Sequence, residues 1–118
     1  MQDLKNRYKK FAIETGMLIQ VLPKSTINTA YSNQLIRSSS SPGTNYRSAC
    51  RGKSTADFIN KLKIVEEELD ESIYFLELIQ HFNPKLKPQI DSLIKESNEL
   101  LAITIQSLKT SRLNTRTS

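Results

Sequence analysis

The sequence is poor in the residues that small proteins use for cross-links, tight turns and membrane spans. A single cysteine cannot form an internal disulfide, so we expect a reducing, cytoplasmic compartment. Three glycines and four prolines among 118 residues are too few for a turn-rich β-sandwich. No apolar run approaches the roughly 18 residues of a transmembrane helix, and the charged N-terminus lacks the apolar core of a signal peptide. These shortages predict a cytoplasmic α-helical domain without a membrane partner.

Residues that carry out catalysis are equally scarce. His81 is the only histidine, and no second imidazole or thiol stands near it in the sequence to complete a metal site. The glycines are too far apart for a phosphate-binding loop. Cys50 lies on a helical stripe and is interpreted as a small buried hydrophobe, although the neighbouring Arg47 and Arg51 leave a reactive thiolate as the alternative. We therefore predict no enzymatic activity, no catalytic residue, no metal and no cofactor.

What the sequence does contain is helical periodicity. Four segments repeat apolar residues at alternating spacings of four and three, which is typical of the seam of a bundle helix. The expected helices cover residues 3–21, 27–50, 54–80 and a last segment that starts between 84 and 88. Short turns between them favour antiparallel neighbours. The prediction is an all-α, antiparallel up-down four-helix bundle over residues 1–111, followed by a frayed basic tail at 112–118.

The second of these segments contains a sequence that looks unsuited to a helix. Four serines, 38–41, run into Pro42 and Gly43, a composition that is also typical of a linker. Apolar residues continue at helical spacing on both sides of Pro42, which favours one helix kinked at the proline. The linker remains the alternative.

The charges are separated along the chain. Residues 1–53 carry a net charge of +7, residues 54–83 carry −5, and residues 84–118 carry +3. This asymmetry predicts that the acidic third helix pairs with arginines of the second helix, and that a basic surface is left over in the first half. Charge that serves only solubility is the alternative.

Two sets of residues follow from this interpretation. For structural ion pairs the candidates are Arg37, Arg47, Arg51, Glu67 and Glu71, because a guanidinium can pair with a carboxylate through two hydrogen bonds. For contacts with a polyanion the candidates are Arg7, Lys9, Lys10 and Lys53, which have few acids near them in the sequence. The acidic cluster at 66–71 could instead be a solvated face or, least simply, a cation or acid–base site.

Five short stretches resemble a known family. They are Asn33–Ser38, Asn45–Arg51, Ala56–Leu62, Ile64–Glu68 and Asn98–Ile103. In order and spacing they are similar to the four-helix-bundle proteins encoded in 23S ribosomal RNA intervening sequences, the S23-type ribosomal proteins. The accessory variability determinant proteins of diversity-generating retroelements are similar to this family. The resemblance implies the bundle fold, a ring-like homo-oligomer, expected to be a pentamer, and a nucleic-acid role, with no established reaction.

The functional expectation combines these observations. We expect a non-catalytic homo-oligomer that binds nucleic acid, RNA in the first place and otherwise DNA, through a basic surface. The alternative is a protein scaffold or adaptor, such as a reverse-transcriptase accessory of a diversity-generating retroelement.

Overall fold

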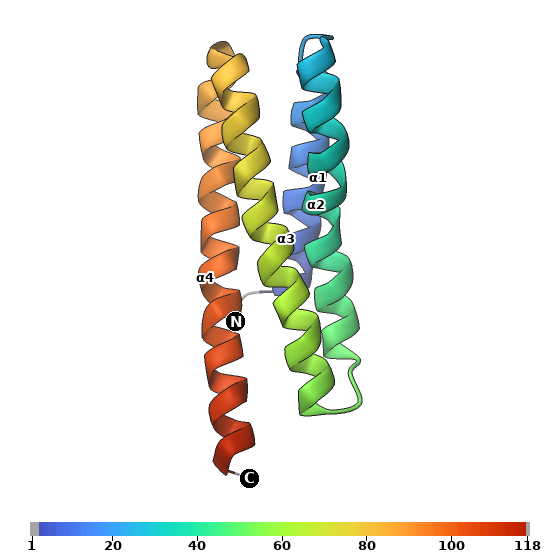
Figure 1. Ribbon diagram of the computed structural model, residues 1–118, viewed down its shortest axis with the longest axis vertical. Coiled ribbons are helices and arrows are strands. Elements are labelled where there is room, and N and C mark those ends of the chain that lie inside the picture. The colour runs from blue at the N-terminus through green and yellow to red at the C-terminus, as the bar shows by residue number, and fades with distance from the viewer. Residues whose placement is uncertain (1–2, 118) are drawn as a thin grey trace.

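The computed structural model describes residues 3–117, with side chains for residues 3–114, as four long helices. They are α1 (Leu4–Val21), α2 (Thr26–Cys50), α3 (Thr55–Phe82) and α4 (Lys87–Thr117), with a short 3-10 turn, η1 (Pro84–Leu86), ahead of α4. Successive helices run in opposite directions along a body of 52 × 21 × 20 Å (Figure 1). The described residues contain no strand. The predicted all-α, up-down four-helix bundle is confirmed.

Side-chain caps mark where the first three helices begin. Asp3, Ser25 and Ser54 each have an extended backbone, and each accepts a hydrogen bond from the backbone N–H three residues later, at 3.2, 3.0 and 3.1 Å. Such a bond satisfies one of the free amide donors of a first helical turn. These caps explain why the helices start where the hydrophobic periodicity starts.

One apolar core runs the length of the bundle and is built mainly from the predicted seams. Burying a large apolar side chain contributes roughly 1.5–3 kcal/mol, so this core is the main stabilising feature of the fold. Its buried members are Tyr8, Phe11, Leu18, Leu35, Ala49, Leu62, Val65, Leu69, Leu76, Ile79, Ile90, Leu93, Leu100 and Leu108.

Polar side chains inside the core form hydrogen bonds to one another or to backbone carbonyls. Asn28 and Asn83 exchange two amide hydrogen bonds of 3.0 and 2.8 Å and join α2 to the end of α3. The Ser72 hydroxyl lies 3.0 Å from that of Ser38 and donates to the backbone of its own helix. No buried side-chain polar atom in the described part of the chain is left without a partner. These pairs fix how α2 and α3 align along their length.

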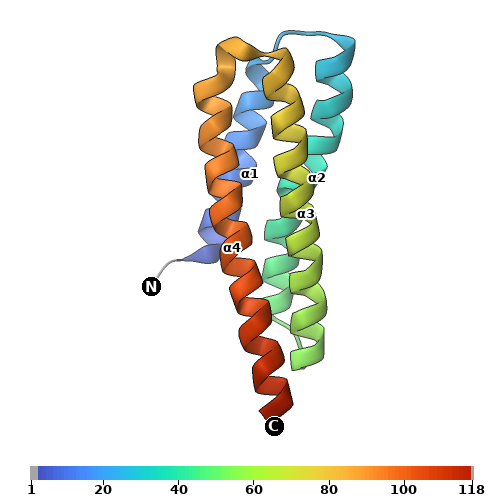
Figure 2. The same cartoon turned by 60° about the vertical axis from the view of Figure 1, so that its left-hand side comes forward.

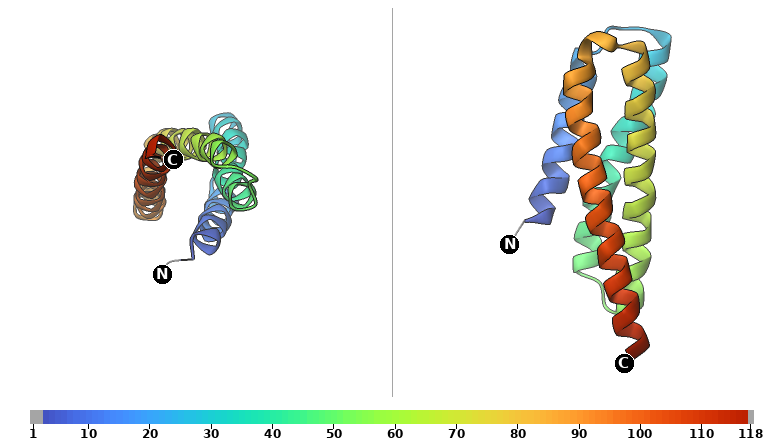
Figure 3. Two further views of the ribbon diagram at one scale, coloured as in Figure 1. Left: turned by 90° about the horizontal axis from the view of Figure 1, so that it is seen from below. Right: turned by 90° about the vertical axis from the view of Figure 1, so that its left-hand side faces the viewer.

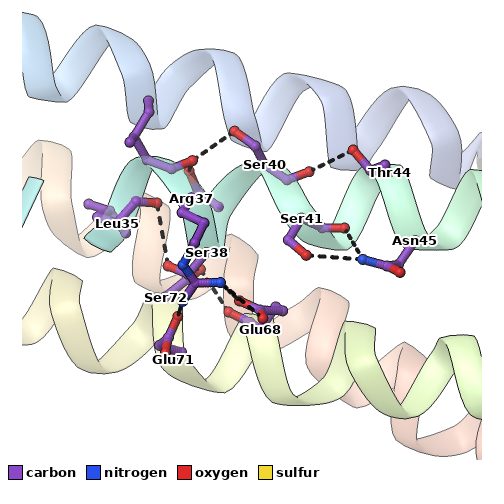
Figure 4. A network of polar contacts seen from close by, with 12 residues as sticks. Leu35, Arg37, Ser38, Ser40, Ser41, Thr44, Asn45, Glu68, Glu71 and Ser72 are labelled. Atoms are coloured by element: carbon purple, nitrogen blue, oxygen red, sulfur yellow. Dashed lines mark hydrogen bonds and ion pairs between the residues drawn. The ribbon is translucent and has the colours of Figure 1, made fainter. Parts of the chain in front are cut away.

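The segment around Pro42 is part of α2, which runs from Thr26 to Cys50 without interruption. The linker alternative is therefore wrong. Hydroxyl and amide side chains around the proline bond back to carbonyls one turn earlier, as Ser40, Thr44 and Asn45 do in Figure 4. The continuity of α2 does not by itself establish a bend of the helix axis, so the kink at Pro42 stays a prediction.

The helices are arranged in chain order as an open arc (Figure 3, left). The first helix, α1, is the shortest at 18 residues, and it packs mainly against α2 and less against α4. The last helix, α4, has 31 residues and extends past the beginning of α1 (Figure 2). It continues through Thr117, so no helix end marks the boundary predicted between residues 111 and 112. Fraying of the tail stays a prediction, and Ser118 lies outside the described residues.

Candidate nucleic-acid interface

A groove between α1 and α2 is lined by several exposed basic side chains of the first half of the chain. Its walls carry Lys5 and Lys9 from α1, with Arg47 and Arg51 from α2. A second hollow shares Arg47 and Arg51 and continues to Lys53 in the α2–α3 turn. We call this continuous surface, with Lys5, Lys9, Arg47, Arg51 and Lys53 on it, the basic groove.

Helix geometry explains why these cations lie together. Lys5 and Lys9 are four residues apart on α1, and Arg47 and Arg51 are four apart on α2, so each pair lies on one face with about 6 Å of helix rise between its members. The two helices approach closely beneath them. A Cβ atom added to Gly43 of α2 would lie 3.2 Å from the Tyr8 Cβ of α1. The absence of a side chain at Gly43 therefore lets the two helices pack closely between the two pairs of cations.

The described residues leave most of the positive charge of the basic groove without an ion-pair partner. All five cations are exposed, and none of them forms an ion pair with any residue that the structure describes. Among the described residues that line the two hollows, Asp57 is the one carboxylate. A surface with five uncompensated cations and one carboxylate attracts polyanions.

Arg37 is paired, and it joins α2 to α3. Its guanidinium contacts Glu68 at 3.0 Å and also bonds to Glu71 (Figure 4). The hydrogen bond to Glu68 raises the pKa of Arg37 above its usual value. The predicted pairing of Arg37 with Glu71 is thus present, but Glu68 takes the place predicted for Glu67. Glu67 is exposed and makes no ion pair with a described residue.

Arg47 and Arg51 do not make the ion pairs predicted for them. Ten residues, roughly 2.8 helical turns, separate Arg47 from Arg37, so its side chain is rotated by about 80° away from the α3 side of the helix. This rotation places it over the α1–α2 groove instead. The helical period alone indicates that Arg37 and Arg47 lie on different faces of α2, whereas the packing of the helices decides which face meets α3. Lys5 is absent from the predicted interface, although its spacing of four from Lys9 indicates a shared face.

Arg7 forms an ion pair that the sequence does not predict. It was predicted to face a polyanion, but it forms a two-bond pair with Glu96 of α4, at 2.6 and 3.0 Å, and contacts Glu99 at 3.4 Å. The hydrogen bond to Glu96 raises the pKa of Arg7. Because 89 residues separate the two partners, local sequence gives no sign of the pair. Arg7 therefore holds α1 against α4.

Lys10 lies on the α4 side of α1 and not in the basic groove. It lines a different hollow, in which Glu14, Glu96 and Glu99 supply carboxylates. Its nearest carboxylate is Glu14, at 3.8 Å. Of the four residues predicted to bind a polyanion, only Lys9 and Lys53 lie in the groove, and their contact with nucleic acid stays a prediction.

Arg7→Ala is expected to destabilise the fold by about 1 kcal/mol, because it breaks a partly buried two-bond ion pair between helices. Polyanion binding at the groove should not change. Urea unfolding and RNA titration measure the two effects, and Lys10→Ala, which removes an exposed cation from the same helix, is the control. The assignment is wrong if Arg7→Ala unfolds like the native chain or loses as much RNA affinity as a groove variant.

Cys50 is exposed at the end of α2, so the prediction of a buried hydrophobe is wrong. Its thiol lies beside Tyr46, whose ring packs on Tyr8 with the ring centroids 5.1 Å apart. Burial, reinforced by the contact with Cys50, raises the pKa of Tyr46 to about 12. Burial also raises the pKa of Tyr8.

These shifts predict a loss of stability in alkali. An unfolded tyrosine ionises near pH 10, whereas folded Tyr46 stays protonated to about pH 12. As the pH rises from 10 toward 12, the unfolded chain releases protons first, so the free energy of unfolding falls. Melting temperatures measured across this range should decrease, and Tyr46→Phe should make the decrease shallower. An identical slope in Tyr46→Phe would contradict the assignment.

Within residues 3–117, no group of three or more His, Cys, Asp and Glu side chains is placed to hold a metal ion. None of the described helices combines the length and the apolar character needed to cross a membrane.

The fold and the groove define a class: a small antiparallel four-helix bundle with a basic groove between its first two helices. The chain belongs to the 23S rRNA-intervening sequence protein family, which it matches over residues 2–106. The family resemblance noted in the sequence is thereby confirmed. A comparison with curated proteins gave no match.

A solved structure supports the same relationship. The chain is similar to a protein of unknown function from the S23 ribosomal protein family of Bacteroides thetaiotaomicron. The two are 31% identical, with a TM-score of 0.80, and the match covers 91% of this chain and 99% of the other.

Proposed function

We propose that the chain is a cytoplasmic, non-catalytic protein that binds RNA through the basic groove. The observation that carries the proposal is the set of five exposed cations on one surface, none of them paired with a described carboxylate. Lys and Arg side chains in such an arrangement contact phosphates and release condensed counterions, which favours binding without reading the base sequence. The family name, which refers to a ribosomal RNA element, is consistent with RNA as the partner.

The proposal includes self-assembly. Ile13, Met17 and Val21 are spaced four residues apart on the outer side of α1, and they are 53%, 57% and 57% exposed. An apolar stripe of this kind on a bundle helix is a candidate subunit interface. Assembly would repeat the basic groove once per subunit and so raise the avidity for a long polyanion. The pentamer rests on the family resemblance.

A protein scaffold is the second candidate, and exposed aromatic side chains favour it. Tyr74 and Phe82 of α3 are 58% and 47% exposed and lie against the rings of Phe75 and Tyr31. Aromatic residues are enriched in protein interfaces. An adaptor for another protein, such as a reverse transcriptase, would use a surface of this kind.

Two measurements on the native chain test these proposals. Fluorescence anisotropy with labelled RNA should show affinity that falls linearly with salt on logarithmic axes. Sedimentation at micromolar concentration should show an oligomer. Absence of RNA binding at 50 mM salt would remove the first proposal, and a monomer would remove self-assembly. An oligomer that binds a reverse transcriptase but no RNA would favour the adaptor.

A further inference from the structure

Hydroxyl groups lie among the cations of the basic groove: Ser40 and Thr44 line the hollow between α1 and α2, and Ser48 and Ser54 line only the hollow toward Lys53. Ser40 and Thr44 are exposed on α2, one turn apart, and they line the same hollow as Lys9 and Arg47. Both hydroxyls have an inward partner. The Ser40 Oγ donates to the carbonyl of Ile36 at 2.8 Å, and the Thr44 Oγ1 donates to the carbonyl of Ser40 at 3.3 Å (Figure 4).

These bonds determine what the hydroxyls can offer a ligand. A Ser or Thr hydroxyl has one hydrogen to donate and two lone pairs that accept. Because the hydrogens of Ser40 and Thr44 point back to the helix, the groove presents their lone pairs. Phosphate oxygens are acceptors too and gain nothing from them. A ribose 2′-hydroxyl can donate to them, and DNA has no such group.

The groove also lacks a surface on which an unpaired base could stack. Among its described lining residues Tyr8 is the one aromatic, and it is 1% exposed. Proteins that hold single strands combine a basic channel with exposed aromatic rings. Base-paired RNA needs no such rings, because it displays phosphates and 2′-hydroxyls along a wide, shallow minor groove.

We propose, building on the proposed function, that the basic groove selects base-paired RNA over DNA. In this arrangement the cations hold the phosphates, and Ser40 and Thr44 accept hydrogen bonds from 2′-hydroxyls between them. The cations set the affinity for any nucleic acid, whereas the two hydroxyls set the preference for ribose.

The test compares three ligands of one base sequence: an RNA duplex, a DNA duplex and single-stranded RNA. The native chain should bind the RNA duplex about tenfold more tightly than the DNA duplex, which is the effect of two ordinary hydrogen bonds. The S40A/T44V variant should lose most of this preference while its affinity for the DNA duplex stays the same. Thr29→Val removes an exposed hydroxyl from the same helix, roughly 16 Å from Ser40 and roughly 22 Å from Thr44 along α2, and should bind all three ligands like the native chain.

The outcomes separate this inference from the proposed function. Equal affinity for RNA and DNA duplexes, tighter binding of the single strand, or an unchanged preference in S40A/T44V would overturn the inference and leave a general polyanion groove. No binding to any of the three ligands would overturn both. If the double variant melts below the native chain, Thr44→Val alone, which keeps the shape of the side chain, should still show a two- to threefold smaller preference.

Discussion

The triple variant Lys9→Ala, Arg47→Ala, Arg51→Ala is expected to bind RNA about two to three orders of magnitude more weakly than the native chain at ~0.1 M salt. Each phosphate contact releases about 0.9 counterions, so three lost contacts should also reduce the steepness of the salt dependence by about 3 on logarithmic axes. The fold should be unaffected, because all three side chains are exposed and form no ion pair with a described residue. Anisotropy titrations from about 50 to about 300 mM salt measure both the affinity and the slope of its salt dependence.

The control removes the same charge from elsewhere. Lys24, Lys63 and Lys85 are exposed, lie outside the basic groove, and make no ion pair with a described residue. Their triple alanine variant should keep most of the RNA affinity. If the two triple variants lose affinity equally, the protein binds RNA through its overall charge, and the groove has no special role.

Tyr8→Ala is expected to destabilise the fold by about 3–5 kcal/mol. Tyr8 is 1% exposed and connects three helices. From α1 its ring packs on Tyr46 of α2 beside Gly43, and its hydroxyl lies 3.0 Å from that of Thr104 in α4. Thr104 donates its own hydrogen to the Leu100 carbonyl, so Tyr8 is the donor in their bond. Losing the ring opens a cavity where the shortest helix is anchored, and urea unfolding measures the cost.

Conservative variants divide this cost into packing and hydrogen bonding. Tyr8→Phe keeps the ring and loses one buried hydrogen bond, which is worth about 1 kcal/mol. Thr104→Val removes the other side of the same bond, so the two single changes should cost more in sum than the double variant. If Tyr8→Phe costs as much as Tyr8→Ala, the hydrogen bond and not the packing anchors α1.

The helices themselves were predictable because their signals are local. Apolar spacing of four and three identifies the buried face within one segment, and Ser54 three residues before Asp57 indicates a helix start. Pro42 was the difficult place. One proline removes one hydrogen bond, and the regular apolar stripe on both sides outweighed the linker-like composition, so α2 continues through it.

The candidate site was only half predictable. Lys9 and Lys53 lie in the basic groove. Arg7, predicted to contact a polyanion, forms an ion pair with Glu96, whereas Arg47 and Arg51, predicted to form ion pairs, line the groove. A side chain's ion-pair partner depends on how each helix is rotated about its axis and on which helix becomes its neighbour. Arg37 and Arg47 are both arginines of α2, yet one faces the carboxylates of α3 and the other faces the open groove.

By itself, the sequence determined the fold class, the four helices and most of the buried core, because hydrophobic periodicity and capping act within a few residues along the chain. Tertiary structure alone decided which cations remain free for a ligand. The bond from Arg7 to Glu96 spans 89 residues, and the groove lies between α1 and α2, which approach each other closely at Gly43. Both depend on the packing of whole helices, and no local pattern of residues records it.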